Sequence, residues 1–423
     1  MHNEVKVCGT PEGYDAKIIL NELIDRQNSV VHVARDDKRM RAMADALNFF
    51  HPDLEVFEFP SWDCLPYDRV SPNMEISSTR MAILSKFADN AAKNFVVLTT
   101  LNAVLQKVPC KSVLRDYAFK AQVGENIDEK LLREFLVRMG FTKSSTVREA
   151  GEYAIRGGII DIFPPGYSNP VRLDLFGNVL DGARLFDSET QLTIEKLNEI
   201  ELAPVSEVVI DEFSIKKFRQ SYRAQFGSTL TNDPLYEAVS NGRKYQGLEH
   251  WLPFFYEELD TVFSYFPTAT ITMYNNLDAD LVSRCKLVSD QYEARAFAND
   301  NKPTKDYAYK PIRPSTLYLD ETEWVKLIKT RRTMIFNPLP QQLGPNIVDS
   351  GGRIGRNFAP ERQSDNLSLF SSLADHLQKR LKHGPVLIAS YSEGSLERLS
   401  GLLKDEGLHQ TVTVSNWSMV TKH

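Results

Sequence analysis

Short apolar runs alternate with helix-like segments over the first 115 residues of the chain. The run SVVHVA is followed by DDKRMRAMADALNFF, a helical pattern that Asp36 or Asp37 can cap. LEVFEF and NFVVLTT are further strand patterns, and the second leads into the helix LNAVLQKV. Parallel strands need long crossovers, usually helices, so repeated strand–helix units predict a parallel sheet covered by helices. We therefore expect an α/β domain over residues 1–115.

The pattern changes over residues 116–203. A helix, DEKLLREFLVRMG, ends at Gly140 and is followed by short strand patterns separated by turns: GEYAIR, IIDIF, PVRLDLF and VLDGARLFD. Short strands joined by tight turns are typical of an antiparallel meander. We expect a small α+β domain that is inserted into the first one.

Mixed α/β patterning returns over residues 204–336, with helices at SIKKFRQSYRAQFG and DETEWVKLIK and strand-like runs at TVFSYF and ATITMY. Residues 337–366 are rich in Pro, Gly, Asn and Ser, which favours a linker or long loop. In residues 367–423, the strand pattern PVLIAS lies between the helices LFSSLADHLQKRLKHG and SEGSLERLSGLLKDEG, and TVTVSNW closes the chain. This predicts a small C-terminal α/β domain.

Several kinds of chemistry lack the residues that they require. The four cysteines are far apart in sequence, no HExxH motif occurs, and no stretch approaches 18 apolar residues. We therefore expect no zinc or redox site, no membrane span and a cytoplasmic location. The first turn, VCGTPEGYDAKII, contains Gly9 and Gly13 but no following lysine, and Gly-Lys occurs nowhere in the chain. A phosphate-binding loop needs that lysine, so we expect no bound nucleotide and no catalytic site.

An arginine inside the strand pattern GEYAIR suggests a different kind of site. Side chains alternate across a strand, so Arg156 faces away from the core, as do Arg172 and Phe176 of VRLDLF. Two arginines around an exposed aromatic ring are a typical protein-interface composition. The ordinary alternative is that Asp174 or Glu152 neutralises the arginines while Phe176 folds into a neighbouring loop. Spacing alone favours neither interpretation.

Longer motifs resemble a known family. GEYAIRGGIIDIFPPG, PVRLDLFGN and RLFDSETQ resemble the second domain of bacterial transcription-repair coupling factors (Mfd), a domain shared with the excision-repair helicase UvrB. FPSWDCLPYDRVSP, SSTRMAIL and LEHWLPFFYEEL resemble the first domain, and GRNFAPER and ASYSEGSLERL resemble the third. The resemblance implies an α/β architecture: a helicase-like parallel-sheet domain built from two segments, an inserted small α+β domain and a C-terminal small α/β domain.

The resemblance also implies partners. In this family the second domain binds the damage-sensing ATPase UvrA through arginines and an aromatic residue that correspond to Arg156, Arg172 and Phe176. The C-terminal domain of the full-length family covers that surface, and the domains that bind RNA polymerase, DNA, ATP and magnesium lie beyond this region. Their motifs are absent here, so we expect an N-terminal fragment with an open face and a truncated third domain.

Three functions follow as hypotheses. The leading one is a non-catalytic adaptor that recruits UvrA to stalled RNA polymerase in transcription-coupled nucleotide excision repair. An ATP-dependent helicase subunit of the UvrB type is the second, and the missing lysine argues against it. A weak, non-specific DNA-binding module is the third, and the formal charge of −6 argues against that.

Overall fold

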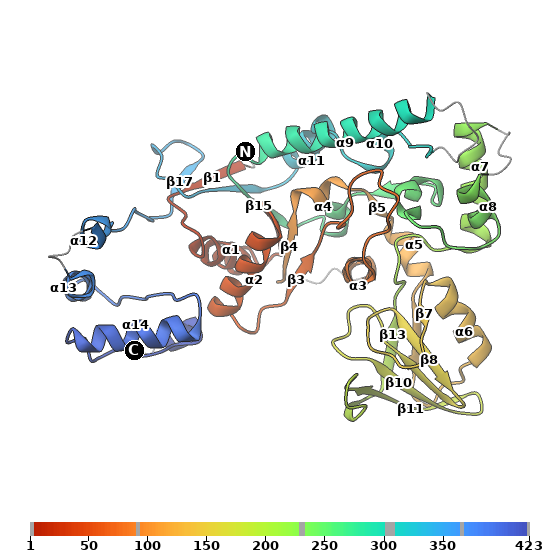
Figure 1. The fold of residues 1–423 in the computed structure, drawn as a ribbon, viewed down its shortest axis with the longest axis horizontal. Coiled ribbons are helices and arrows are strands. Elements are labelled where there is room, and N and C mark those ends of the chain that lie inside the picture. The colour runs from red at the N-terminus through yellow and green to blue at the C-terminus, as the bar shows by residue number, and fades with distance from the viewer. Residues whose placement is uncertain (1–3, 90–93, 228–232, 301–308, 364–367, 421–423) are drawn as a thin grey trace.

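The structure, a computed structural model, describes residues 4–89, 94–227, 233–300, 309–363 and 368–420. Its largest element is a seven-stranded sheet in the order β17-β1-β16-β15-β2-β4-β3, in which every neighbouring pair is parallel (Figure 1). The strands are β1 (Glu4–Cys8), β2 (Val30–Ala34), β3 (Val56–Phe59), β4 (Val96–Thr100), β15 (Thr270–Tyr274), β16 (Thr333–Asn337) and β17 (Ile347–Asp349). The predicted α/β fold, with a parallel sheet built from two chain segments, is confirmed.

Helices pack on both faces of this sheet, and all residues of β2 and β4 are therefore buried. Parallel sheets of this kind have apolar side chains on both faces. One face packs against α1 (Tyr14–Arg26) and α2 (Asp37–Phe50), where Val30 and Leu98 join the apolar core. The other packs against α3 (Met74–Asp89), α4 (Leu101–Leu105), α9 (Leu277–Asp300) and α11 (Glu321–Lys329). Asp36 caps α2, as predicted, by accepting a hydrogen bond from the Arg39 amide at 2.8 Å.

The inserted unit is a separate six-stranded sheet in the order β12-β11-β10-β9-β8-β7 (Figure 1). Neighbours pair antiparallel except β7 and β8, and α6 (Glu129–Arg138) covers the inner face. A two-stranded sheet of β6 (Phe119–Gln122) and β13 (Glu199–Leu202) completes the unit. The strands are β7 (Thr142–Lys143), β8 (Glu152–Arg156), β9 (Ile159–Ile162), β10 (Val171–Phe176), β11 (Val179–Phe186) and β12 (Thr193–Leu197).

A buried ion pair joins the inserted unit to the main sheet domain. Arg80 of α3 is fully buried and donates to Glu207, which follows β13, at 2.6 Å. Trp62 donates its indole N–H to the same carboxylate at 2.9 Å, and the Arg80 guanidinium lies 4.4 Å from the Phe59 ring centroid. Separating the two partners would leave a buried charge without compensation, which is strongly destabilising. The ion pair therefore holds the segment after β13 against α3, at the point where the chain returns to the first domain.

Around the main sheet, α5 (Lys111–Asp116) and the short pair β5 (Val108–Pro109) and β14 (Leu259–Asp260) lead into and out of an aromatic-rich cluster. Its helices are α7 (Glu212–Phe226), α8 (Pro234–Ser240), η1 (Leu248–Phe254) and α10 (Pro314–Leu317). The strand prediction for TVFSYF is wrong: Val262–Tyr265 is a 3-10 helix, η2. The Ser264 amide donates to the Thr261 carbonyl at 3.0 Å, and this turn buries Phe263 and Phe266 together in the core.

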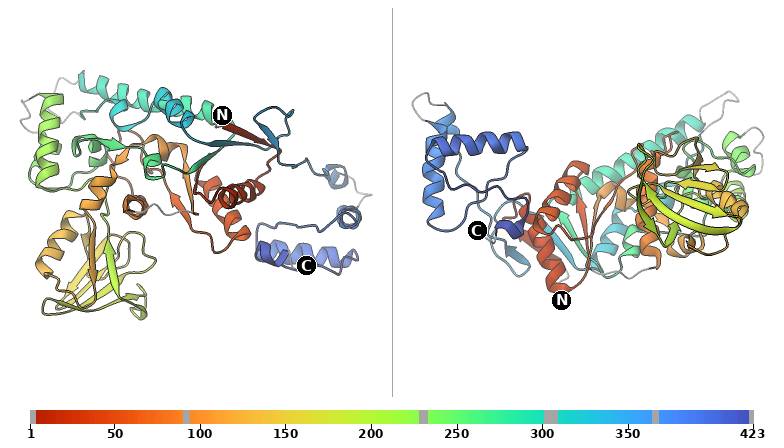
Figure 2. Two further views of the ribbon diagram at one scale, coloured as in Figure 1. Left: turned by 180° about the vertical axis from the view of Figure 1, so that it is seen from behind. Right: turned by 90° about the horizontal axis from the view of Figure 1, so that it is seen from below.

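The C-terminal unit contains α12 (Ala359–Gln363), α13 (Leu369–Leu381), α14 (Glu393–Asp405) and α15 (Trp417–Val420) (Figure 2). PVLIAS, predicted as a strand, forms no strand, and its residues 386–388 are exposed. A strand needs a hydrogen-bonded neighbour, and no ladder reaches this segment in the described residues. Within the stretch expected to be a linker, β17 instead pairs with β1. Trp417 packs against Phe49 and Phe50 of α2.

Candidate functional site

The outer face of the inserted sheet brings the three predicted site residues to one side. Arg156 on β8 is paired with Ile159 on β9, and Ile159 is paired with Asp174 on β10. Phe176 follows two positions along β10, so it has the same facing as Asp174 and Arg172. The face therefore contains Arg156 and Phe176 near one end of the strands, with Arg172 further along.

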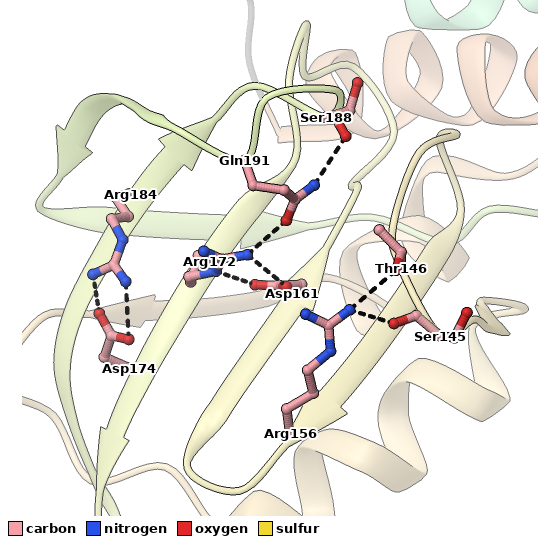
Figure 3. A network of polar contacts seen from close by, with 9 residues as sticks. All are labelled: Ser145, Thr146, Arg156, Asp161, Arg172, Asp174, Arg184, Ser188 and Gln191. Atoms are coloured by element: carbon pink, nitrogen blue, oxygen red, sulfur yellow. Dashed lines mark hydrogen bonds and ion pairs between the residues drawn. The ribbon is translucent and has the colours of Figure 1, made fainter.

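Arg156 lies at the tip of β8 and is exposed. One of its guanidinium nitrogens donates to the Ser145 carbonyl and, at 3.2 Å, to the Thr146 hydroxyl (Figure 3). Neither partner is charged, and no carboxylate of the described residues forms an ion pair with Arg156. Glu152, one of the two neutralising candidates, instead accepts from the amides of Arg148 and Glu149. Arg156 therefore keeps its positive charge uncompensated and held in place by the 144–146 loop.

Arg172 has a different environment, because its guanidinium faces a buried carboxylate. It donates to both oxygens of Asp161, at 2.6 and 2.9 Å, and to the Gln191 side-chain oxygen at 3.0 Å (Figure 3). Its guanidinium carbon also lies 4.4 Å from the Phe186 ring centroid. The hydrogen bond to Asp161 raises the pKa of Arg172 above its usual value. Asp161, only 2% exposed, is thus the partner, whereas Asp174 pairs with Arg184.

Phe176 does not fold into a neighbouring loop: 83% of the residue is exposed. Val179, its cross-strand partner on β11, is 37% exposed, and Ile159 at the start of β9 is 38% exposed. The three residues form an apolar rim on the outer face. Sequence reasoning identified Phe176 but missed Ile159 and Val179, although alternation with the buried Ile160 and Leu180 would have pointed to both.

Glycine turns allow the two hairpin tips to lie side by side. Gly157 has φ of +63°, a conformation that L side chains rarely adopt. A Cβ on Gly158 would lie 2.6 Å from the carbonyl oxygen of Leu175, and the Leu175 amide donates to the Gly158 carbonyl at 2.7 Å. This contact ties the β8–β9 tip, which carries Arg156, to the end of β10, which carries Phe176.

We call the outer face around Arg156, Ile159, Phe176 and Val179, with the Arg172 network beside it, the rim face. It contains the exposed cation of Arg156, the apolar rim, and the guanidinium groups of Arg172 and Arg184, which carboxylates hold in fixed positions. Arginine and aromatic residues of this kind are enriched in protein interfaces and often supply most of the binding energy. In the described part of the chain, no three His, Cys, Asp or Glu side chains are grouped as metal ligands. The geometry suits protein binding.

The loop after β1, where a phosphate cradle would lie, uses its amides internally. The amides of Gly9 and Thr10 donate to the carbonyls of Leu339 and Asn337, at 3.1 and 3.0 Å. The amide of Gly13 donates to the Asp15 carboxylate at 2.9 Å. Asp15 therefore places a negative charge at the start of α1, where a phosphate would otherwise be favoured, and Arg39 neutralises it at 3.0 Å.

Comparisons with known proteins agree with these features. The sequence model of the UvrB interaction domain family matches residues 119–208, which include the rim face. The chain is 30% identical to the transcription-repair-coupling factor of Rickettsia bellii over 90% of its length and 33% of that protein. It is 33% identical to the Haemophilus influenzae factor and 28% identical to the Escherichia coli factor, over 95% of the chain and 34% of each relative.

The chain thus spans about one third of the length of these relatives. No helix among its described residues is both long and apolar enough to cross a membrane. The matched region coincides with the motifs GEYAIRGGIIDIFPPG and PVRLDLFGN, on which the resemblance rested. These matches support an N-terminal region of transcription-repair-coupling factors (Mfd) as the part of those proteins to which this chain is similar.

Proposed function

We propose that this chain is a non-catalytic adaptor that binds UvrA through the rim face and so recruits it to stalled RNA polymerase for transcription-coupled repair. The match of residues 119–208 to the UvrB interaction domain supports this role, as does the similarity to transcription-repair-coupling factors. The observation that carries the proposal is the 83% exposure of Phe176 beside the uncompensated Arg156.

The energetics favour an aromatic anchor at this position. Covering a phenylalanine side chain contributes about 1.5–3 kcal/mol from apolar burial. Phe176 lies on a strand of a packed sheet, so little backbone entropy is lost when a partner covers it. Arg156 adds a charged donor whose loop contacts already restrict it. A UvrA surface with an apolar pocket next to a carboxylate would complement this pair.

Arg172 has a supporting role in this proposal. Its guanidinium is mostly covered and committed to Asp161 and Gln191, so it contributes chiefly by holding β9, β10 and the 187–192 turn together. An alanine at this position would therefore weaken UvrA binding partly by disturbing the sheet. We attribute the direct contacts to Arg156 and Phe176, with Ile159 and Val179 around them.

We further infer that the adaptor acts without a nucleotide of its own, whereas ATP, magnesium, RNA polymerase and the DNA on which the motor acts are handled by other domains of the full-length family. The internal use of the Gly9, Thr10 and Gly13 amides supports this view, because a phosphate cradle requires free backbone donors.

Hydrogen–deuterium exchange on the chain with and without UvrA tests where the partner binds. We expect slower exchange in the segments 156–159 and 176–179 when UvrA is added. Helix α7, in a different part of the molecule, is the internal control and should exchange at an unchanged rate (Figure 1). Protection that leaves both rim segments unaffected would reject the proposed surface.

A further inference from the structure

A row of cations lies on α7, remote from the rim face. Lys216, Arg219 and Arg223 occupy positions i, i+3 and i+7 of this helix, so they share one side of it, and all three are exposed. Together with Ile215, Gln220 and Glu212 they line a shallow open groove along the helix. In Figures 1 and 2, α7 and α8 lie at the end of the molecule opposite α13 and α14. We call Lys216, Arg219 and Arg223 the α7 basic row.

Among the described residues, no counter-charge pairs with the cations of this row. None of the three cations has a carboxylate within ion-pair distance in the described part of the chain, whereas the neighbouring Lys217 pairs with Glu257 at 2.5 Å. The segment 228–232 that follows α7 contains no charged residue in its sequence, STLTN. Glu212 is the one acid lining the groove, and it lies at the first turn of α7.

One aromatic side chain orients the two arginines. Arg219 donates from Nε to the Tyr236 hydroxyl at 3.4 Å, and the Arg223 guanidinium carbon lies 5.4 Å from the centroid of the same ring. Tyr236 belongs to α8, which packs beside α7. Because both guanidinium groups are held against one ring, less side-chain entropy is lost when they bind an anion.

We propose that the α7 basic row binds the phosphate backbone of duplex DNA. A rise of 1.5 Å per residue spreads the three positions over about 10.5 Å of the helix axis, a length over which one DNA strand presents about three phosphates at about 3.4 Å each. Phe213, the 61% exposed ring in the first turn of α7, is not among the residues that line this groove. A row of like charges without an aromatic anchor inside it suits a repeating polyanion better than a protein surface, which usually needs such an anchor. This site is additional to the UvrA-binding function and does not depend on it.

The binding is independent of base sequence and sensitive to salt. Phosphate contacts position a protein on DNA but carry no base information. The overall charge of −6 opposes DNA approach elsewhere on the surface, so the row acts as a local contact of modest affinity. Three phosphate contacts give a slope of log K against log salt of roughly −2.7.

Fluorescence anisotropy of the chain with a labelled duplex of about 20 base pairs, at several salt concentrations, tests the proposal. The triple variant K216A/R219A/R223A is expected to lose affinity at least about tenfold at low salt and most of its salt slope. The matched control K86A/K130A/R133A removes the same charge from residues paired with Glu55, Glu134 and Glu129, and it should bind like the parent. R219K/R223K keeps the charge and should retain most of the affinity.

Three results would overturn the proposal. The triple variant could bind within twofold of the parent with an unchanged slope. The matched control could lose as much affinity as the triple variant, which would assign the effect to net charge. Poly-glutamate could compete as well as DNA at equal charge, which would identify the row as a site for acidic proteins. Unchanged melting temperatures exclude misfolding as the cause of lost binding.

Discussion

Arg156 and Arg172 face the same side of one sheet, yet their surroundings give them different functions. Arg172 donates to both oxygens of Asp161, a carboxylate that is almost fully buried. In the described part of the chain, Arg156 donates to uncharged oxygens alone, and it stays exposed. Substitution of the first therefore acts mainly on stability, and substitution of the second acts mainly on binding.

The Arg172→Ala variant is expected to lose roughly 3 kcal/mol of unfolding free energy, because Asp161 would remain charged and buried without its partner. Urea unfolding followed by circular dichroism measures this loss. Removing both charges, in Asp161→Asn with Arg172→Leu, should recover part of it. A single variant as stable as the parent would show that the ion pair is unimportant.

His32 makes the stability of the main sheet depend on pH. Burial and, to a lesser extent, the nearby charge of Arg39 lower the pKa of His32 to about 3, while Nδ1 lies 3.0 Å from the Thr272 hydroxyl. In the unfolded chain, His32 takes up a proton near pH 6.5, but in the folded chain it stays neutral at that pH. The contribution of neutral His32 to the unfolding free energy is therefore fully present above pH 6.5 and decreases below it.

Between pH 7.5 and pH 5 this histidine should lower the unfolding free energy by about 2 kcal/mol. His32→Asn can keep the Thr272 hydrogen bond without a titrating group, so its stability should fall by about 2 kcal/mol less over the same range. Equal pH dependence in the parent and in His32→Asn, measured by urea unfolding, would contradict the assignment.

Period-two alternation was enough to predict that Arg156, Arg172 and Phe176 face outward. It could not identify Asp161 as the partner of Arg172, because that choice depends on the register between β9 and β10. Asp174 was the nearer acid in sequence, but it lies on the same strand as Arg172 and pairs across to Arg184 on β11. The local sequence predicts which side of the sheet a side chain faces, whereas its ion-pair partner depends on how the strands pair in the fold.

At the scale of single elements, two hairpin tips carry the rim face. Gly158→Ala would place a Cβ 2.6 Å from a backbone oxygen that cannot move away easily, and this would push β10 away from the β8–β9 tip. Gly177→Ala meets no atom within 4 Å and costs only the strain of φ at +61°, about 1 kcal/mol.

We therefore expect Gly158→Ala to lower the melting temperature more than Gly177→Ala and to weaken UvrA binding as well. Differential scanning calorimetry ranks the two variants directly. The reverse order, with Gly177→Ala the less stable, would mean that the two tips are not held together as described.

The elements that sequence predicted well are those whose partners follow closely in the chain, such as β8 to β11. PVLIAS has the composition of a strand but no neighbour in the described residues, so its backbone does not form one. TVFSYF shows the opposite case: its rings are buried, but a tight turn at Thr261–Ser264 packs them better than an extended strand would. The apolar and aromatic composition of such a segment indicates that it is buried, but its backbone conformation depends on tertiary contacts.

At the scale of the whole molecule, the first domain is a parallel sheet covered by helices on both faces, and the loop after β1 uses the amides of Gly9, Thr10 and Gly13 internally. Adding ATP with magnesium should leave the melting temperature unchanged, because the amides of Gly9, Thr10 and Gly13 are already used. A ligand at about one hundred times its dissociation constant would add roughly 2.7 kcal/mol of stability. A clear upward shift with millimolar ATP would therefore contradict the adaptor interpretation.

The central claim is that the rim face binds UvrA. A calorimetric titration of UvrA into the chain tests it most directly. Phe176→Ala should weaken binding by about 2 kcal/mol, near thirtyfold, with an unchanged melting temperature, and adding Arg156→Ala should weaken it further. Phe213→Ala removes a comparably exposed phenylalanine from α7 and should bind like the parent. If Phe176→Ala bound UvrA as tightly as the parent does, the rim face would not be the UvrA-binding surface.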